Sequence, residues 1–155
     1  EKGKSKRLPK MLGFQAEGAA PIVRNKIVEN PQTIATAIKI GNPASWKQAE
    51  KARDESGGLI DMVSDREILE AYKLLAAREG IFVEPASGAS VAGLLKLVKK
   101  GYFEQANRPT GQQANRIVCI LTGHGLKDPD RAIETIKQPK VVKANLKAVL
   151  REIGY

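Results

Sequence analysis

The sequence contains few of the residues that form disulfides and metal sites, and it lacks long apolar runs. Its 155 residues include one cysteine, Cys119, and one histidine, His124. A single cysteine excludes a disulfide within the chain and fits a reducing compartment, so we expect a cytoplasmic protein. One histidine and one cysteine support no metal site. No apolar run approaches the roughly 20 residues of a membrane span, and the charged start predicts no signal peptide.

Aromatic residues are also scarce, at 5% of the chain. Phe14, Trp46 and Phe82 lie far apart in the sequence, so no aromatic motif for stacking on RNA bases is visible. Negative charge is in deficit, since 17 acidic residues oppose 26 basic ones and leave a net charge of +9. This charge is compatible with an anionic partner, such as a phosphate ester or a nucleic acid. Beyond residues 1–10 the lysines are scattered rather than patterned, which favours a generally basic surface without such a partner.

The remaining composition, with 42% hydrophobic residues, is that of one domain with an apolar core. We expect strands at residues 10–16, 59–63, 81–83 and 116–121. We expect helices at residues 21–29, 32–39, 43–55, 64–80, 86–100, 132–138 and 141–155, and an exposed loop at 102–115. Because strands and helices alternate, the predicted fold class is α/β, with a mostly parallel sheet and flanking helices.

Two helix starts carry clear capping signals. Ser64 is followed three residues later by Glu67, which predicts a capping box at the start of one helix. Asn42 precedes Pro43, which predicts an N-cap and a first-turn proline at another. These signals locate the two helix starts more closely than hydrophobic periodicity alone.

The most informative segment is residues 116–130. An apolar run at 117–121 stops abruptly at Thr122-Gly-His-Gly, the pattern of a buried parallel strand whose carboxyl end opens into a ligand crevice. Thr122 would supply a hydroxyl at the strand tip, and Gly123 and Gly125 would allow positive φ and close approach to a ligand. His124 lies between the two glycines, where it could act as a general base or simply as a turn residue.

Four blocks of sequence, at residues 9–21, 33–46, 79–93 and 121–128, together resemble one enzyme family. The Glu-Pro-Ala-Ser at residues 84–87 is shared by many lyases and deaminases that depend on pyridoxal phosphate (PLP). Adding Ile-Gly-Asn-Pro-Ala-Ser-Trp and Leu-Thr-Gly-His-Gly makes the chain resemble the C-terminal part of the threonine synthases. This resemblance implies PLP as cofactor and part of the large PLP-binding domain of a tryptophan-synthase-β-like fold.

The resemblance also implies site residues, each with a plainer alternative. Thr122 would bind the pyridine nitrogen of PLP, or would only cap a turn at a strand end. Glu84 and Ser87 would lie near the PLP ring, although Glu84 could instead bind the backbone amides of the following helix. Gly41 and Asn42 would line the open face of the cofactor, or would only mark a boundary between helices.

The implied reaction converts O-phospho-L-homoserine and water to L-threonine and phosphate, the last step of threonine biosynthesis. One alternative keeps the fold and changes the chemistry, to a threonine or serine deaminase or another PLP-dependent β-replacement enzyme. A second alternative, based on charge alone, is a small basic α/β module that binds nucleic acid. If the chain is part of a threonine synthase, we expect a homodimer, and neither a nucleic acid nor a membrane as partner.

In the family, the lysine that forms the Schiff base with PLP and the loop that binds the PLP phosphate precede the matched region. No lysine here has a matching context, and no Gly/Asn-rich phosphate loop is visible. We therefore expect residues 1–155 to be the C-terminal portion of a PLP-dependent catalytic domain. We expect no catalytic residue within this chain, a missing N-terminal part as its partner, and no activity of the chain alone.

Overall fold

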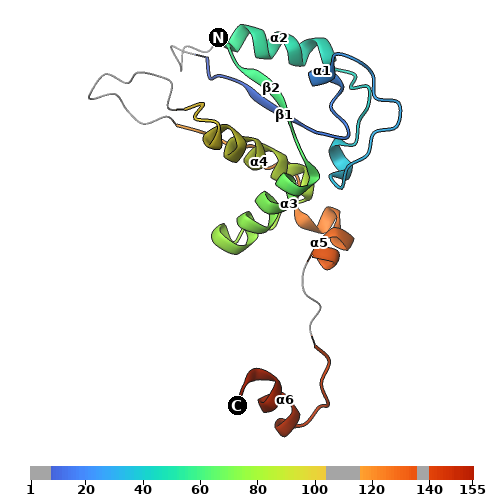
Figure 1. Cartoon of the computed structure of the whole chain (residues 1–155), viewed down its shortest axis with the longest axis vertical. Coiled ribbons are helices and arrows are strands. Elements are labelled where there is room, and N and C mark those ends of the chain that lie inside the picture. Colours follow the sequence, from blue (N-terminus) through green and yellow to red (C-terminus); the bar gives the residue numbers. More distant parts are fainter. Residues whose placement is uncertain (1–7, 104–115, 136–139) are drawn as a thin grey trace, which may run out of the picture.

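The computed structural model describes residues 8–103, 116–135 and 140–155, and these contain a small parallel sheet with helices around it (Figure 1). Strand β1 (Leu12–Ala16) pairs in parallel with β2 (Leu59–Val63), with Leu12 opposite Leu59 and Ala16 opposite Val63. Both strands were expected from the sequence. The α/β class with a parallel sheet is confirmed.

Six α-helices and three further helical turns make up the rest of the regular structure in the described part of the chain. The helices are α1 (Pro21–Arg24), α2 (Trp46–Ser56), α3 (Asp65–Leu74), α4 (Pro85–Lys99), α5 (Pro129–Thr135) and α6 (Leu146–Ile153). The turns are η1 (Thr36–Ile38), the π-helical η2 (Leu75–Glu79) that extends α3, and η3 (Gly125–Lys127). Helix α4 packs against both strands and against α3, while α2 lies on the other side of the sheet (Figure 1).

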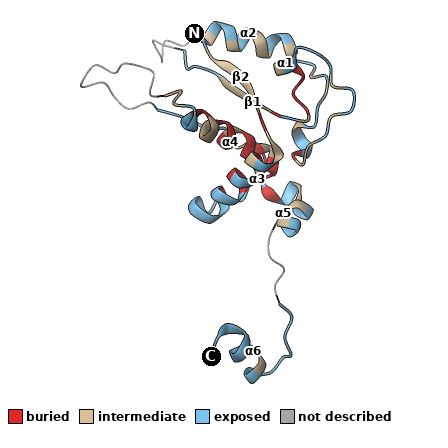
Figure 2. Cartoon of the chain, in the orientation of Figure 1, coloured by how far each residue is buried: buried red, intermediate tan, exposed pale blue. Residues whose placement is uncertain are grey.

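Small residues on α4 allow the close packing on which the core depends. A Cβ at Gly93 would overlap the ring of Phe14 on β1, and one at Gly88 would lie 3.2 Å from the carbonyl oxygen of Ile68 on α3. Figure 2 shows that buried residues are concentrated on α4 and where α3 meets it. This packing fixes the start of α4 against the end of the sheet.

The capping box at the start of α3 is confirmed. The side chain of Ser64 accepts a hydrogen bond from the backbone N–H of Glu67 at 3.3 Å, and Glu67 Oε2 accepts one from the N–H of Ser64 at 2.8 Å. Burial alone would raise the pKa of the Glu67 carboxyl, but the hydrogen bonds from Ser64 and the charges of Lys96 and Lys99 together lower it. The ionised carboxylate therefore stabilises this helix start.

The predicted helix at 21–29 is much shorter in the structure, because α1 ends at Arg24. Asn25 follows in the left-handed conformation, with φ of 51°. Its N–H donates to the carbonyl of Ile22, which closes the helix.

The predicted helix at 32–39 is reduced to the three residues of η1. The carboxylate of Asp65 accepts hydrogen bonds from the hydroxyl of Thr33 and from the N–H of Ile34. These bonds from another helix hold the first residues in a turn, a tertiary constraint that periodicity does not reveal. The helix expected at 43–55 begins later, at Trp46, and its N-cap is Ser45 rather than Asn42.

Two predicted strands are wrong. Residues 81–83 form no strand, and Val83 makes only an isolated bridge with His124. Residues 116–121 form no strand either, so Thr122 does not end a central strand. A strand requires a partner for its backbone groups, and neither β1 nor β2 pairs with these residues.

Part of segment 116–121 nevertheless packs against the core. The side chains of Cys119 and Leu121 contact it, and burial raises the pKa of the Cys119 thiol. Val118 and Ile120, at the alternate positions, are 76% and 67% exposed. Residues 118–121 thus alternate between exposed and packed side chains, as in a strand with one covered face, but no neighbouring strand among the described residues pairs with them.

The C-terminal elements were expected with different bounds. Helix α5 begins before the predicted 132–138, and residues 136–138 lie outside the described residues, as do 104–115 of the expected loop. Helix α6 is capped by Asn145, whose Oδ1 accepts from the N–H of Ala148 at 2.9 Å. Figure 1 shows α6 apart from the rest of the fold. The apolar residues Leu146 and Ile153 on this helix are exposed.

We expect Ser64→Ala to lower the free energy of unfolding by about 1 kcal/mol, because it removes one half of the capping box. Urea denaturation of both proteins measures the change. Ser45→Ala is the matched control, because Ser45 occupies the N-cap position of α2 without a side-chain hydrogen bond to that helix. An equal loss in the two variants would contradict a specific role for the box.

Candidate functional site

Three of the five site residues that the resemblance implies, Glu84, Ser87 and Thr122, meet at the amino-terminal end of α4. Ser87, in the first turn of α4, is 2% exposed. Its Oγ accepts a hydrogen bond from the N–H of Gly123 at 2.8 Å and lies 3.4 Å from the hydroxyl oxygen of Thr122. The N–H of Glu84 donates to the carbonyl oxygen of Gly123 at 3.0 Å. The turn that begins at Thr122 is thus bonded directly to the start of α4.

The turn also runs antiparallel to the residues before α4. Val83 and His124 form an antiparallel bridge, and the N–H of Gly125 donates to the carbonyl oxygen of Phe82 at 3.2 Å. These backbone bonds place Thr122 beside Ser87 although 35 residues separate them in the chain. The resemblance placed Glu84, Ser87 and Thr122 near one cofactor, and turns rather than paired strands bring their segments together.

Glu84 has a buried carboxylate in this cluster. Its side chain is 5% exposed and forms an ion pair with Lys127, whose Nζ lies 3.4 Å from both carboxylate oxygens. Glu84 is the N-cap residue of α4, but its side chain makes no capping hydrogen bond. The plainer alternative for Glu84, a helix cap, is therefore not what the structure shows.

The two glycines of the turn are required by close packing. A Cβ at Gly123 would overlap the carboxylate of Glu84, and one at Gly125 would overlap the ring of Phe82. Neither glycine has positive φ. We expected these glycines to lie close to a ligand. In the structure they lie close to the side chains of Glu84 and Phe82.

His124 is a turn residue. Its Nδ1 accepts a hydrogen bond from the N–H of Leu126 at 3.1 Å, which caps η3, and its ring lies edge-on to that of Phe82 at 5.5 Å. Both interactions orient the turn. They leave no bond from this imidazole to Thr122, Ser87 or Glu84 among the described residues.

Gly41 makes its close contact with the chain itself. A Cβ there would overlap the carbonyl oxygen of Val28, whose N–H donates to the carbonyl of Gly41 at 3.0 Å. Within the described ranges, Gly41 shares no hydrogen bond with Glu84, Ser87 or Thr122. Its place on the open face of a cofactor stays a prediction.

Sequence reasoning missed Lys127 and Asp128 as neighbours of the cluster. Lys127 pairs with Glu84, and Asp128 Oδ2 accepts a hydrogen bond from the hydroxyl of Thr36 in η1 at 3.2 Å. The only available signal was their position within the Leu-Thr-Gly-His-Gly-Leu-Lys-Asp block. The adjacent pair fixes the end of the turn to two different elements.

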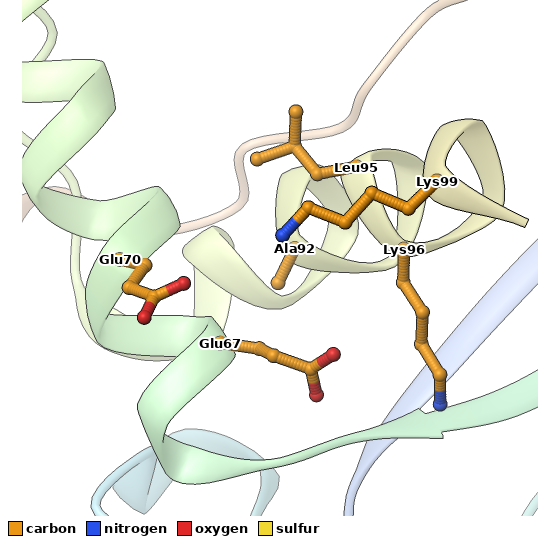
Figure 3. Close-up of a pocket in the computed structure, with 6 residues that line it drawn as sticks. All are labelled: Glu67, Glu70, Ala92, Leu95, Lys96 and Lys99. Atoms are coloured by element: carbon orange, nitrogen blue, oxygen red, sulfur yellow. The ribbon is translucent and has the colours of Figure 1, made fainter.

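A small cleft between α3 and α4 lies elsewhere. Figure 3 shows that acidic side chains from α3 and basic side chains from α4 line it. The lining residues are Glu67, Glu70, Ala92, Leu95, Lys96 and Lys99. Glu67 is already bonded to Ser64, and Lys96 to Asp61 and the carbonyl of Met62. The cleft therefore belongs to the helix packing and adds nothing to the cluster.

Comparison with known proteins places the chain in a family. The family model described as "Pyridoxal-phosphate dependent enzyme" matches residues 1–123. The chain belongs to the pyridoxal-phosphate-dependent enzymes. The cofactor that the resemblance implies is thereby confirmed at the level of the family. No helix in the described residues has both the length and the apolar character needed to cross a membrane.

Individual relatives agree with the resemblance seen in the four blocks. The chain is 53% identical to a threonine synthase of Halalkalibacterium halodurans over 94% of its own length and 39% of that protein. It is 49% identical to a threonine synthase of Synechocystis over 100% of its length and 38% of that protein. The chain thus spans about two-fifths of the length of these relatives.

Solved structures support the fold. Maize serine racemase superposes with a TM-score of 0.54 at 20% identity, covering 81% of this chain and 39% of that one. A fungal L-serine ammonia-lyase from Rhizomucor miehei gives a TM-score of 0.51 at 19% identity, covering 83% and 41%. At these identities the likeness concerns the fold alone.

We expect Gly123→Ala to destabilise the protein by about 1–3 kcal/mol, because the added methyl group would overlap the buried carboxylate of Glu84. Thermal or urea unfolding measures the loss. Adding Glu84→Ala to the same chain removes the opposing carboxylate and should restore part of the stability. No recovery in the double variant would show that something other than Glu84 opposes the methyl group.

Proposed function

We propose that the chain is the C-terminal part of a threonine synthase, which converts O-phospho-L-homoserine and water to L-threonine and phosphate. The observation that carries this proposal is the 53% identity to a threonine synthase over 94% of the chain. Residues of the resembling blocks also meet in space, since the Thr122 turn lies against the Glu84–Ser87 helix start. The basic net charge of +9 is compatible with a phosphorylated substrate.

The chemistry of the cluster fits a PLP ring. Thr122 is exposed, and its described side-chain neighbour is the hydroxyl of Ser87 at 3.4 Å, a weak contact that leaves the threonine hydroxyl able to donate to a ligand. When bound, PLP supplies an electron sink that stabilises carbanions next to its imine carbon. We propose that Thr122 donates to the pyridine nitrogen. A neutral hydroxyl keeps that nitrogen less protonated than a carboxylate would, which favours elimination and replacement over transamination.

Ser87 and Glu84 have a supporting task in this proposal. The Oγ of Ser87 accepts from the N–H of Gly123 and also lies 3.3 Å from its carbonyl oxygen, so it fixes the backbone beside Thr122. The backbone N–H of Glu84 donates to the carbonyl oxygen of the same residue, Gly123. Together they orient the threonine hydroxyl before a ligand arrives, which reduces the entropy lost on binding.

The rest of the catalytic machinery belongs, in this proposal, to the part of the relatives that the chain does not match. That part would provide the amine that binds PLP and the backbone N–H groups that bind its phosphate. Residues 1–155 would then be one portion of a PLP-dependent catalytic domain of a cytoplasmic homodimer. A related deaminase would use the same fold, so the substrate must be tested directly.

The chain of residues 1–155 alone is expected to release neither threonine nor phosphate from O-phospho-L-homoserine in the presence of PLP. The full-length protein that carries this sequence is expected to release both in equal amounts. Ammonia release from threonine or serine is the parallel assay for a deaminase. Turnover by residues 1–155, with a PLP–lysine adduct trapped by borohydride, would overturn the proposal that the amine that binds PLP lies outside these residues.

Thr122→Val in the full-length protein is expected to leave folding intact and to reduce turnover. Valine preserves the shape but removes a hydrogen bond worth about 0.5–1.5 kcal/mol, which corresponds to a roughly two- to tenfold decrease in rate. Thr122→Ser keeps the hydroxyl and is the matched control. Turnover and the PLP absorption spectrum report the change, and a valine variant that matches wild type in both would exclude the cofactor role.

A further inference from the structure

The ion pair between Glu84 and Lys127 joins a buried charge to an exposed one. The Glu84 side chain is 5% exposed, whereas that of Lys127 is 61% exposed. The ammonium group lies 3.4 Å from each carboxylate oxygen. A carboxylate in such a position needs a compensating cation, because burial of an unpaired charge costs several kcal/mol.

Lys127 ends the turn that begins at Thr122, five positions further along the chain. The carboxylate of Glu84 lies directly against the Cα of Gly123, so that even a methyl group there would overlap it. The ammonium group of Lys127 thus holds the carboxylate inside the turn. Without this cation the carboxylate would be more stable in water than in the protein. It would then leave its buried position against Gly123.

Displacing the carboxylate would loosen the bonds that orient Thr122. The N–H of Glu84 donates to the carbonyl of Gly123, and the N–H of Gly123 donates to Ser87. Both bonds lie within one residue of Thr122. The charge of Lys127 is therefore linked through Glu84 to the hydroxyl that faces the proposed ligand.

We propose that Lys127 is a positioning residue of this site, which acts through Glu84 to hold the Thr122–Lys127 turn onto the start of α4. The catalytic meaning of this inference rests on the proposed function. The effect of the Lys127–Glu84 ion pair on the position of Thr122 can be measured through the spectrum and Kd of bound PLP, without any substrate.

The test uses the full-length protein, with Lys127→Met and Lys127→Arg made in the wild type and Lys127→Met also made in a Glu84→Gln background. Lys127→Met should lower kcat/KM about tenfold, equivalent to about 1.4 kcal/mol. It should also shift the absorption spectrum of bound PLP and raise its Kd. Lys127→Arg should restore most of the loss. In the Glu84→Gln background, Lys127→Met should change these values less than about twofold, because its partner charge is already absent.

Lys100→Met is the matched control. Lys100 lies at the other end of α4 and pairs with Asp61 at 3.3 Å, with a similar exposure of 57%. It should leave the PLP spectrum and kcat/KM at wild-type values. If Lys100→Met lost as much activity as Lys127→Met, the loss would come from a general change in charge or stability. That result would overturn the proposal.

Additive effects of Lys127→Met and Glu84→Gln, or a wild-type PLP spectrum in Lys127→Met, would also overturn it. If Lys127→Met alone does not fold, the double variant decides, because it removes both charges and should match Glu84→Gln in PLP binding. A wild-type protein that binds PLP but produces no threonine would reject the proposed function. The PLP spectra and Kd values would still decide the role of Lys127.

Discussion

The hydrogen bond from the N–H of Gly123 to the buried hydroxyl of Ser87 joins two segments that are 36 residues apart. The other features of the site depend on it. It fixes the turn that carries Thr122 to the first turn of α4, and the backbone bond from Glu84 to the carbonyl of Gly123 closes the same junction. The Ser87 hydroxyl needs this hydrogen bond, because Ser87 is 2% exposed and a buried polar group without a partner destabilises the fold.

This junction is positioned by the close packing of α4. The glycines at 88 and 93 let the helix approach α3 and β1 closely, as the overlaps that a Cβ would produce there show. The capping box at Ser64 defines where α3 begins, and α3 covers α4 in turn. A local sequence signal and a run of small residues thus determine where Ser87 lies in space.

Much of this could be predicted because its causes are local. The strands at 12–16 and 59–63, the start of α3 at the Ser64–Glu67 box and the helix after Pro85 all follow from short-range patterns. The meeting of Glu84, Ser87 and Thr122 was anticipated from the resemblance. The strands at 81–83 and 116–121 were not found, because a strand exists only with its partner and neither β1 nor β2 pairs with these residues. The ion pair of Lys127 with Glu84 depends on the path of a turn, which no pattern in the sequence specifies.

The central claim is that the Thr122 turn and the start of α4 form the surface that contacts the PLP ring. A crystal structure of the full-length protein with bound PLP tests it most directly. The account predicts that the hydroxyl of Thr122 lies about 2.7–3.2 Å from the pyridine nitrogen, with Ser87 still bonded to Gly123. A ring placed away from Thr122, or bound with its nitrogen against a different group, would contradict it.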